Sequence, residues 1–262
     1  MNTEKVIDHV VHWLQRYANE AKSKGFVVGV SGGIDSALTS TLCAKTGYPT
    51  LLVEMPIHQS PNQVSRAQNH ISRLEKEFIY VSKQHVDLTS TFDLLLSQLP
   101  VCDNDHTLQL ARANTRSRLR MTTLYYLAGL NGYLVAGTGN KIEDFGVGFY
   151  TKYGDGGVDL SPIADLTKSE VYACAKTLGI DEDILLAPPT DGLFGDDRSD
   201  EDQIGASYPE LEWAMEFSGD ESDLSEREKV VLNIYRTLNK QNQHKMQTIP
   251  VCSIPKELKE LK

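Results

Sequence analysis

The sequence predicts an α/β fold in which a doubly wound, mostly parallel sheet carries helices on both faces. Short apolar runs of strand length alternate with segments of ten or more residues whose apolar side chains recur at helical spacing. This alternation predicts a parallel sheet, because each helix carries the chain back to the start of the next strand. The first apolar run, FVVGV at 26–30, ends in a turn with two glycines that leads into a helical pattern.

The first half of the chain supplies most of these elements. A helix is expected over residues 3–24, where apolar side chains keep helical spacing until Gly25 ends the pattern. The elements expected next, in chain order, are a strand over 26–30, a helix over about 35–45, a strand over 50–54, a helix over 63–76, a strand over 78–81, helices over about 87–98 and 106–130, and a strand over 133–136. Ligands of such sheets bind beyond the carboxyl ends of the strands, where the loops after Val30 and Ala136 are expected.

The second half has a different character. Residues 137–162 are rich in glycine and predict a loop, and 167–178 predict a helix. An acidic loop is expected over 188–205 and a last long helix over 224–241. Because the chain shows no internal repeat and no clear linker, a single domain over residues 1–262 is expected.

Composition limits the possible functions. The formal net charge of −10 argues against a protein that wraps nucleic acid, since such binding usually needs a basic face. No run approaches the ~18 apolar residues of a membrane span, and the first residues lack the layout of a signal peptide. The cysteines lie far apart, which indicates reduced thiols and a cytoplasmic protein. They are Cys43, Cys102, Cys174 and Cys252.

The turn in residues 27–40, VVGVSGGIDSALTS, has two possible interpretations. Its backbone N–H groups and the start of the next helix can bind an anion, although the lysine of the usual triphosphate loop is missing. Asp35 lies near that helix start and could reach a magnesium ion that bridges phosphates. Alternatively, the segment is only a tight turn in which Asp35 and Ser36 cap the helix.

The string Ser-Gly-Gly-Ile-Asp-Ser at 31–36 resembles the pyrophosphate loop of the N-type ATP pyrophosphatases. These enzymes share an adenine-nucleotide alpha-hydrolase-like fold, cleave ATP between its α- and β-phosphates, and adenylate a carboxylate or carbonyl oxygen. The resemblance explains the missing lysine, because the loop would hold a departing pyrophosphate rather than a transferred γ-phosphate.

A second motif narrows the resemblance. Residues 135–162 read VAGTGNKIEDFGVGFYTKYGDGGVDLSP, and LTKSEV follows at 166–171. Together with the first loop, these motifs resemble the ammonia-dependent NAD synthetases over about residues 5–250. In that family ATP adenylates the nicotinate carboxylate of nicotinic acid adenine dinucleotide, and ammonia displaces AMP to give NAD. The resemblance therefore implies a ligase that uses ATP and Mg²⁺ and forms a homodimer, because the family's site lies at a dimer interface.

The resemblance also assigns roles by position. Residues expected to bind the ATP phosphates are Gly29, Val30, Ser31, Gly32, Gly33, Ile34, Asp35 and Ser36, and further ATP contacts are expected at Thr138, Lys168 and Thr190. Residues expected to face the dinucleotide are Arg116, Lys152, Asp159, His244 and Lys245. Asp35 and Glu143 are the expected magnesium ligands, and Asp35 and Lys168 the expected catalytic residues.

Two departures from the family pattern bear on these roles. The segment from Glu143 to Lys152 is one residue longer than the pattern, so Asp144 competes with Glu143 as the second magnesium ligand. Met246 stands where an arginine is common after the His-Lys pair.

A row of arginines needs a negative partner. On a helix Arg112, Arg116 and Arg120 lie on one face at a spacing of four residues, whereas Arg118 points to nearly the opposite side. Like charges at that spacing repel by roughly 0.2–0.5 kcal/mol per pair. The partner is either a set of carboxylates on a neighbouring helix or the dinucleotide, and the family pattern favours the dinucleotide for Arg116.

The acidic segment 188–205 is either a solvated loop or a lid. Its start resembles the closing segment of the family, and a lid that excludes water would protect an adenylated intermediate from hydrolysis.

Two other functions compete with NAD synthesis. One is another enzyme of the superfamily, such as a synthetase for GMP, asparagine or argininosuccinate, or a tRNA-thiolating enzyme, although the latter would show paired cysteines and a basic surface. A chain of this length is expected to lack a glutaminase, so the nitrogen would come from free ammonia or from a separate donor. The second is a non-catalytic adenine-nucleotide sensor, which would keep the glycine turn but have no use for Glu143 or Lys152.

Overall fold

A parallel sheet forms the centre of the protein, in a computed structural model that describes residues 1–190 and 199–259. Within these residues the sheet has four strands in the order β3-β2-β1-β4, and every neighbouring pair is parallel. The strands are β1 (Phe26–Gly29), β2 (Thr50–Glu54), β3 (Val81–His85) and β4 (Leu134–Val135). The predicted α/β fold is therefore confirmed.

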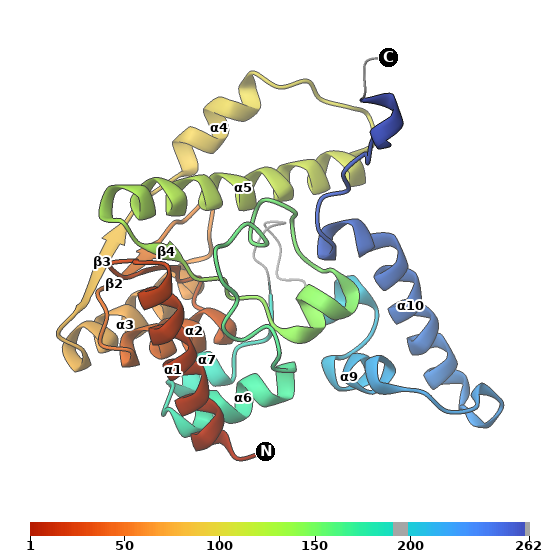
Figure 1. Ribbon diagram of the computed structural model, residues 1–262, viewed down its shortest axis with the longest axis horizontal. Helices are drawn as coiled ribbons and strands as arrows, with labels where there is room; N and C mark the ends of the chain where they lie inside the picture. Colours follow the sequence, from red (N-terminus) through yellow and green to blue (C-terminus); the bar gives the residue numbers. More distant parts are fainter. Residues whose placement is uncertain (191–198, 260–262) are drawn as a thin grey trace.

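Helices surround this sheet (Figure 1). Those of the first half are α1 (Thr3–Glu20), α2 (Ile34–Lys45), α3 (Pro61–Glu77), α4 (Thr89–Ser97) and α5 (Asp105–Asn131). Those of the second half are a π-helix, η1 (Ile142–Val147), then α6 (Lys168–Thr177), α7 (Glu182–Leu185), α8 (Asp200–Ile204), α9 (Tyr208–Glu216), the 3₁₀ turn η2 (Glu221–Asp223), α10 (Glu226–Met246) and the 3₁₀ turn η3 (Lys256–Leu258). None of the helices in the described ranges is both long and apolar enough to cross a membrane.

The central strand β1 shows why both faces of the sheet are covered. Its side chains alternate between the two faces, as in any strand. Phe26 and Val28 pack into a core with α1, α2 and α6, whereas Val27 packs into a separate core with α4 and α5. All three side chains are fully buried, so β1 is apolar at every one of these positions.

A third hydrophobic cluster lies beyond the sheet. It joins Ile142 and Val147 of η1 to Leu211 of α9 and Leu232 of α10. Figure 1 shows α9 and α10 together on one side of the molecule, away from the strands. This cluster thus supports the loop that follows β4, although the organisation as one domain stays a prediction.

The third strand lies later in the chain than the expected range of 78–81. Phe78 packs against the core just before the strand, and β3 itself begins at Val81. Because β3 is the edge strand beside β2, its side chains after Val81 are exposed and polar. A search for apolar runs therefore favours the apolar residues before the strand instead of the strand itself, although Ile79 and Tyr80 are exposed.

The acidic segment is also not a continuous loop. Ser199 caps α8, and Asp202 completes a capping box with it, so part of the acidic run is the first turn of a helix. The sequence analysis did not predict α9, and α10 continues to Met246 beyond the expected end at 241. Other acidic positions of this segment lie outside the described residues, namely Asp191, Asp196 and Asp197.

Candidate active site

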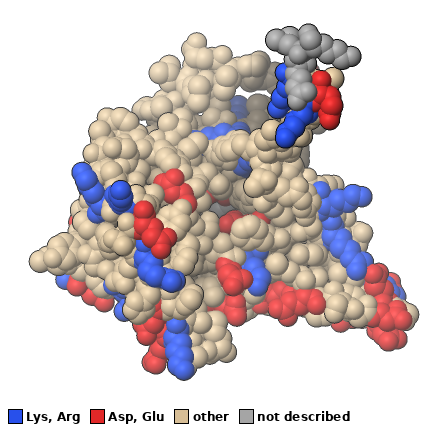
Figure 2. Space-filling model, viewed as in Figure 1, with Lys and Arg blue, Asp and Glu red and all other residues tan. Residues whose placement is uncertain are grey.

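A pocket opens at the carboxyl ends of the parallel strands. It is lined by the glycine turn after β1, the residues after β2, the loop after β4, and the inner face of α5. Its volume of about 260 Å³ lies near the lower end for small-molecule sites, roughly 300–1,000 Å³. Figure 2 shows a hollow near the centre of this face, with acidic side chains beside it. The position agrees with the expectation that ligands bind at this edge of the sheet.

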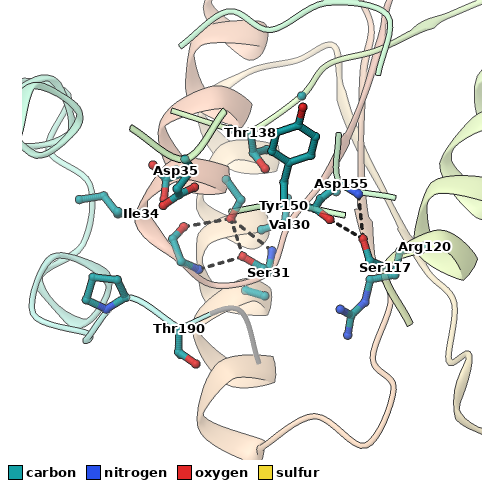
Figure 3. A pocket seen from close by; sticks show the side chains of 18 of the residues that line it. Val30, Ser31, Ile34, Asp35, Ser117, Arg120, Thr138, Tyr150, Asp155 and Thr190 are labelled. Carbon is teal, nitrogen blue, oxygen red and sulfur yellow. Dashed lines mark hydrogen bonds between the residues drawn. The ribbon is translucent and has the colours of Figure 1, made fainter. Parts of the chain in front are cut away.

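Hydrogen bonds between its own residues shape the glycine turn (Figure 3). Ser36 Oγ donates to the carbonyl oxygen of Gly33 at 2.9 Å and accepts from the N–H of Ser31 at 3.2 Å. The N–H of Gly33 donates to Ser31 Oγ at 3.2 Å. Helix α2 starts directly after Gly33, which has no side chain to cap it, so its first N–H groups lie at the pocket.

Gly32 is held in a conformation that favours glycine. Its φ is +85°, in the left-handed region. A Cβ atom on Gly32 would lie 2.6 Å from the backbone oxygen of Gln63 in α3. The turn is therefore both strained and closely packed against α3. A simple connection between a strand and a helix would require neither feature.

Lys168 lies between two carboxylates from distant parts of the chain. Its Nζ is 2.6 Å from Asp35 Oδ2 and 3.0 Å from Glu143 Oε1. Burial by itself would lower the pKa of Lys168, but the charges of Asp35 and Glu143 outweigh burial and raise it, so the ammonium keeps its charge. Asp35 thus faces a charged partner across the pocket and does not act as the helix cap that the alternative interpretation proposed.

Two neutral side chains complete this cluster. Asn140 Nδ2 donates to Asp35 Oδ1 at 3.1 Å. The hydroxyl of Tyr208 donates to Glu143 Oε1 at 2.6 Å, and burial followed by the charge of Glu143 raises the pKa of this phenol, so it stays a donor. The sequence analysis missed both residues, because nothing in the local pattern of α9 connects Tyr208 with a loop 65 residues earlier.

The carboxylates fit a magnesium ion that also binds substrate. Within the described parts of the chain, no group of three or more His, Cys, Asp or Glu side chains could hold a metal by itself. Two carboxylate oxygens lie within 3.0 Å of one cationic atom, Lys168 Nζ, so Asp35 and Glu143 converge on a site for positive charge. Mg²⁺ usually takes one or two carboxylates and completes its shell with phosphate oxygens and water. Asp35 and Glu143 would therefore hold the ion only together with a phosphate ligand.

Two further acids line the pocket. Burial and then the charge of Glu143 raise the pKa of Asp144 to about 8. Asp155 also lines the pocket, and although the residue as a whole is exposed, desolvation of its carboxyl by the surrounding protein raises its pKa. Its carboxylate accepts from Ser117 Oγ at 2.5 Å (Figure 3). Asp155 was not selected from the sequence, where it is one of several acids in a glycine-rich stretch.

Most of the expected ATP-binding residues meet in this pocket. Those that line it are Gly29, Val30, Ser31, Gly33, Ile34, Asp35, Ser36, Thr138, Lys168 and Thr190, and the expected magnesium ligand Glu143 lines it as well. Asp200, at the start of α8, also lines the pocket and accepts from the Tyr208 hydroxyl at 3.3 Å. The backbone N–H of Asp200 donates to the oxygen of Pro189, so the described ends of the acidic segment meet beside the pocket.

The residues expected to face the dinucleotide lie outside this pocket. Asp159 links α5 to β4, because its carboxylate accepts from the Tyr125 hydroxyl at 3.0 Å and from the Val135 N–H at 2.8 Å. Lys152 donates through Nζ to the carbonyl oxygen of His244. Lys245 donates through Nζ to two carbonyl oxygens in residues 148–150, at 2.8 Å each.

Three of the four arginines of α5 have different environments. The guanidinium carbon of Arg116 lies 4.6 Å from the centre of the Phe92 ring. Arg120 lines the pocket and donates to the Met55 carbonyl oxygen at 3.1 Å. Arg118 is exposed, and its Nε donates to the carbonyl oxygen of Lys152 at 3.3 Å. Of the three, Arg118 therefore lies beside an expected dinucleotide contact, although helical spacing separated it from the row.

Comparison with known proteins gives a consistent result. The family model described as NAD synthase matches residues 6–249. The chain is 37% identical to the NH(3)-dependent NAD(+) synthetase of Syntrophomonas wolfei over 99% of this chain and 100% of that protein. It is 39% identical to the NH(3)-dependent NAD(+) synthetase of Carboxydothermus hydrogenoformans, over 81% of this chain and 85% of that protein.

Solved structures have the same fold. The NMN synthetase from Francisella tularensis superposes with a TM-score of 0.86 and 26% identity, over 97% of this chain and 100% of that chain. The NH3-dependent NAD synthetase from Campylobacter jejuni superposes with a TM-score of 0.77 and 24% identity, over the same shares of the two chains.

Gly32→Ala should weaken ATP binding by at least ~10-fold, the equivalent of about 1.4 kcal/mol. The reason is that a Cβ atom would meet the Gln63 carbonyl and force the turn out of its left-handed conformation. Isothermal calorimetry would measure the affinity. Gly33→Ala is the matched control, because Gly33 has an extended backbone and its Cβ would meet only Ser31 Oγ, at 3.4 Å. Equal affinities for both variants would contradict the role given to Gly32.

The same assay can test whether Glu143 or Asp144 is the second magnesium ligand. Glu143→Gln should weaken the binding of Mg²⁺ with ATP by at least ~10-fold, since it removes one of the two charges that converge at Lys168. Asp144→Asn should leave the affinity within about threefold of the unaltered protein, because the side chain of Glu143 and not that of Asp144 contacts Lys168. The opposite ranking would identify Asp144 as the ligand.

Proposed function

The chain belongs to the NAD synthase family, and from that premise we propose that it is an ammonia-dependent ligase that converts nicotinic acid adenine dinucleotide to NAD. ATP would adenylate the nicotinate carboxylate with release of pyrophosphate, and ammonia would then displace AMP. The observation that carries the proposal is the pocket in which an anion-binding glycine turn adjoins Asp35, Glu143 and Lys168. A nucleotide sensor would not require two partly buried carboxylates at this point.

The adenylation step brings two negatively charged groups together, the carboxylate of the substrate and the α-phosphate of ATP. A carboxylate oxygen of the substrate forms a bond to the α-phosphorus while the bond to the β-phosphate oxygen breaks. The N–H groups of the glycine turn and of α2 would hold the departing pyrophosphate. Asp35 and Glu143 would hold Mg²⁺, which when bound supplies positive charge to the phosphates. Lys168 keeps both carboxylates in place and remains charged, so it can also attract a phosphate oxygen.

The amidation step needs a proton acceptor. Most ammonia is ammonium at neutral pH, and it must lose a proton before its lone pair can attack the carbonyl carbon of the adenylate. AMP then leaves with the bridging oxygen. We propose that Asp144 and Asp155, in their ionised forms, accept this proton, because both line the pocket and a raised pKa makes each carboxylate a stronger base.

We assign the dinucleotide to the surface around Lys152. Arg118 donates to the carbonyl oxygen of Lys152, and the Lys152 ammonium donates to the carbonyl oxygen of His244, so two cationic residues and the main chain of His244 adjoin there. Asp159 would act from the same side of α5, two turns further along the helix, through its bond to Tyr125. Arg116, which the family pattern suggested, packs on Phe92 in this structure and would reach the substrate only by leaving that ring.

A homodimer is part of the proposal. The outer sides of α4 and α5 expose large apolar side chains, and Figure 1 shows these two helices along one side of the molecule. They are Leu94, Leu110, Tyr126 and Leu130. A second copy packed on this surface would bury them, as expected for an exposed apolar patch. The free cysteines support the expectation that the reaction takes place in the cytoplasm.

A second substrate has to be considered because of the similarity to NMN synthetase. That structure superposes over nearly the whole chain with a TM-score of 0.86. The corresponding amidation would use nicotinic acid mononucleotide, which carries the same carboxylate but lacks the second nucleotide. The two candidate substrates differ in the second nucleotide: only the dinucleotide needs protein contacts beyond the nicotinate nucleotide.

The reaction can be tested directly with purified protein. ATP, Mg²⁺, ammonium and the dinucleotide should yield NAD, AMP and pyrophosphate in equal amounts, measured by chromatography. Asp35→Asn should lower turnover by at least ~10²-fold, a loss of roughly 3 kcal/mol of transition-state stabilisation. Formation of ADP and orthophosphate would contradict the proposed cleavage of ATP. A higher kcat/KM with the mononucleotide would show that the second candidate is correct.

Arg118→Ala should raise the KM for the dinucleotide by about tenfold and leave the KM for ATP within about twofold, because its charge adjoins Lys152 and lies outside the ATP pocket. Arg116→Ala, on the same helix, is the matched control and should change the KM for the dinucleotide by less than about threefold. Steady-state kinetics would measure both. If Arg116→Ala has the larger effect, the contact suggested by the family pattern is the correct one.

A further inference from the structure

One face of α10 contacts the backbone of the loop that follows η1. Three donors share this face because they are spaced three residues apart along the helix. All of them donate to carbonyl oxygens in residues 146–150. The bonds are Asn239 Nδ2 to Gly146 O at 2.7 Å, Asn242 Nδ2 to Val147 O at 2.8 Å, and Lys245 Nζ to Gly148 O and Tyr150 O at 2.8 Å each.

These bonds satisfy carbonyl groups that the π-helix leaves without partners. The last carbonyl groups of a helix have no donor within the helix itself, and η1 ends at Val147. Asn239 is oriented for this role, because its Oδ1 accepts from Gln243 Nε2 at 2.7 Å. Lys245 is half-buried, so its ammonium has exchanged part of its water for the two carbonyl oxygens.

The contact is close as well as polar. Gly148 follows η1 with a φ of +67°, in the left-handed region. A Cβ atom on Gly148 would lie 2.4 Å from Asn242 Cβ and 2.9 Å from Met246 Cε. The backbone of the loop therefore lies directly on α10, and little room is left for a shift of one against the other.

The same turn carries Glu143 at its other end. The N–H groups of Gly148 and Phe149 both donate to the carbonyl oxygen of Glu143, the latter at 2.9 Å. The first of these bonds spans five residues, as in a π-helix, which is rare and needs outside support. A displacement of residues 146–150 would thus move the backbone of Glu143, whose side chain contacts Lys168 and Tyr208.

We infer that Asn239, Asn242 and Lys245 are positioning residues, which hold the π-helical turn from α10 and thereby place the Glu143 carboxylate at Lys168. The inference rests on the proposed function for its kinetic consequences. It gives Lys245 a role different from the substrate contact that the family resemblance implies. A contact would act on substrate binding, whereas a positioning residue acts on the rate of the bound complex.

Lys245→Met and Asn242→Ala test this inference, with Lys240→Met as the matched control on the exposed side of α10. Both test variants should lower kcat about tenfold and leave the KM for the dinucleotide within about twofold, while the control behaves like the unaltered protein. A KM that rises while kcat is unchanged would overturn the inference and make Lys245 a substrate contact. A variant with a lower melting temperature and unchanged kcat would overturn it as well, because the role would then be structural only.

Hydrogen exchange of the ligand-free protein gives a readout that does not depend on activity. Amides of residues 143–150 should exchange faster in Lys245→Met and in Asn242→Ala than in the unaltered protein and the Lys240→Met control. Unchanged exchange in both test variants would overturn the inference. An unaltered protein that forms no NAD would contradict only the proposed function, since the exchange experiment would still show whether α10 holds the turn.

Discussion

The site depends on one buried interaction, the contact of Lys168 with Asp35 and Glu143. It joins the start of α2, the π-helix η1 and the start of α6, which are otherwise separate parts of the fold. Removing one partner of such a buried ion pair typically costs about 3–5 kcal/mol, because the other charge stays buried without compensation. Here one ammonium serves two carboxylates, so the cluster keeps an excess of negative charge. That excess is what a bound magnesium ion would neutralise.

The placement of Glu143 is supported from several sides. Asn140 bonds to the N–H of Glu143 as well as to Asp35, and Tyr208 binds the carboxylate from α9. Helix α10 holds the far end of the same turn through backbone carbonyl groups. The hydrophobic cluster of η1, α9 and α10 excludes water behind this turn. The second half of the chain thus acts as a support for one carboxylate that the sheet alone would not position.

Charge also explains how a protein with a formal net charge of −10 can bind anionic substrates. The groups that we propose to bind anions in the pocket are mostly backbone N–H groups, which carry no formal charge and do not appear in a count of residues. The cationic side chains of the site lie at separate positions. Lys168 lies between two carboxylates, and Arg118 contacts the main chain of Lys152. The acids Asp144 and Asp155, which we propose as proton acceptors, line the same pocket, and burial raises the pKa of both.

The sequence by itself determined the parallel α/β fold and the position of the glycine turn, because both depend on short-range spacing: apolar strands, helical periods and two glycines after a strand. Most of the residues that it selected for ATP binding also line the pocket. Only the tertiary structure decided which side chains meet. The strand β3 is polar because it lies at the sheet edge, and Tyr208 reaches Glu143 only through the packing of α9. Helical spacing placed Arg118 apart from the arginine row, but the loop that carries Lys152 packs on its side of α5. Such contacts depend on where distant segments pack, and no local pattern of residues contains that information.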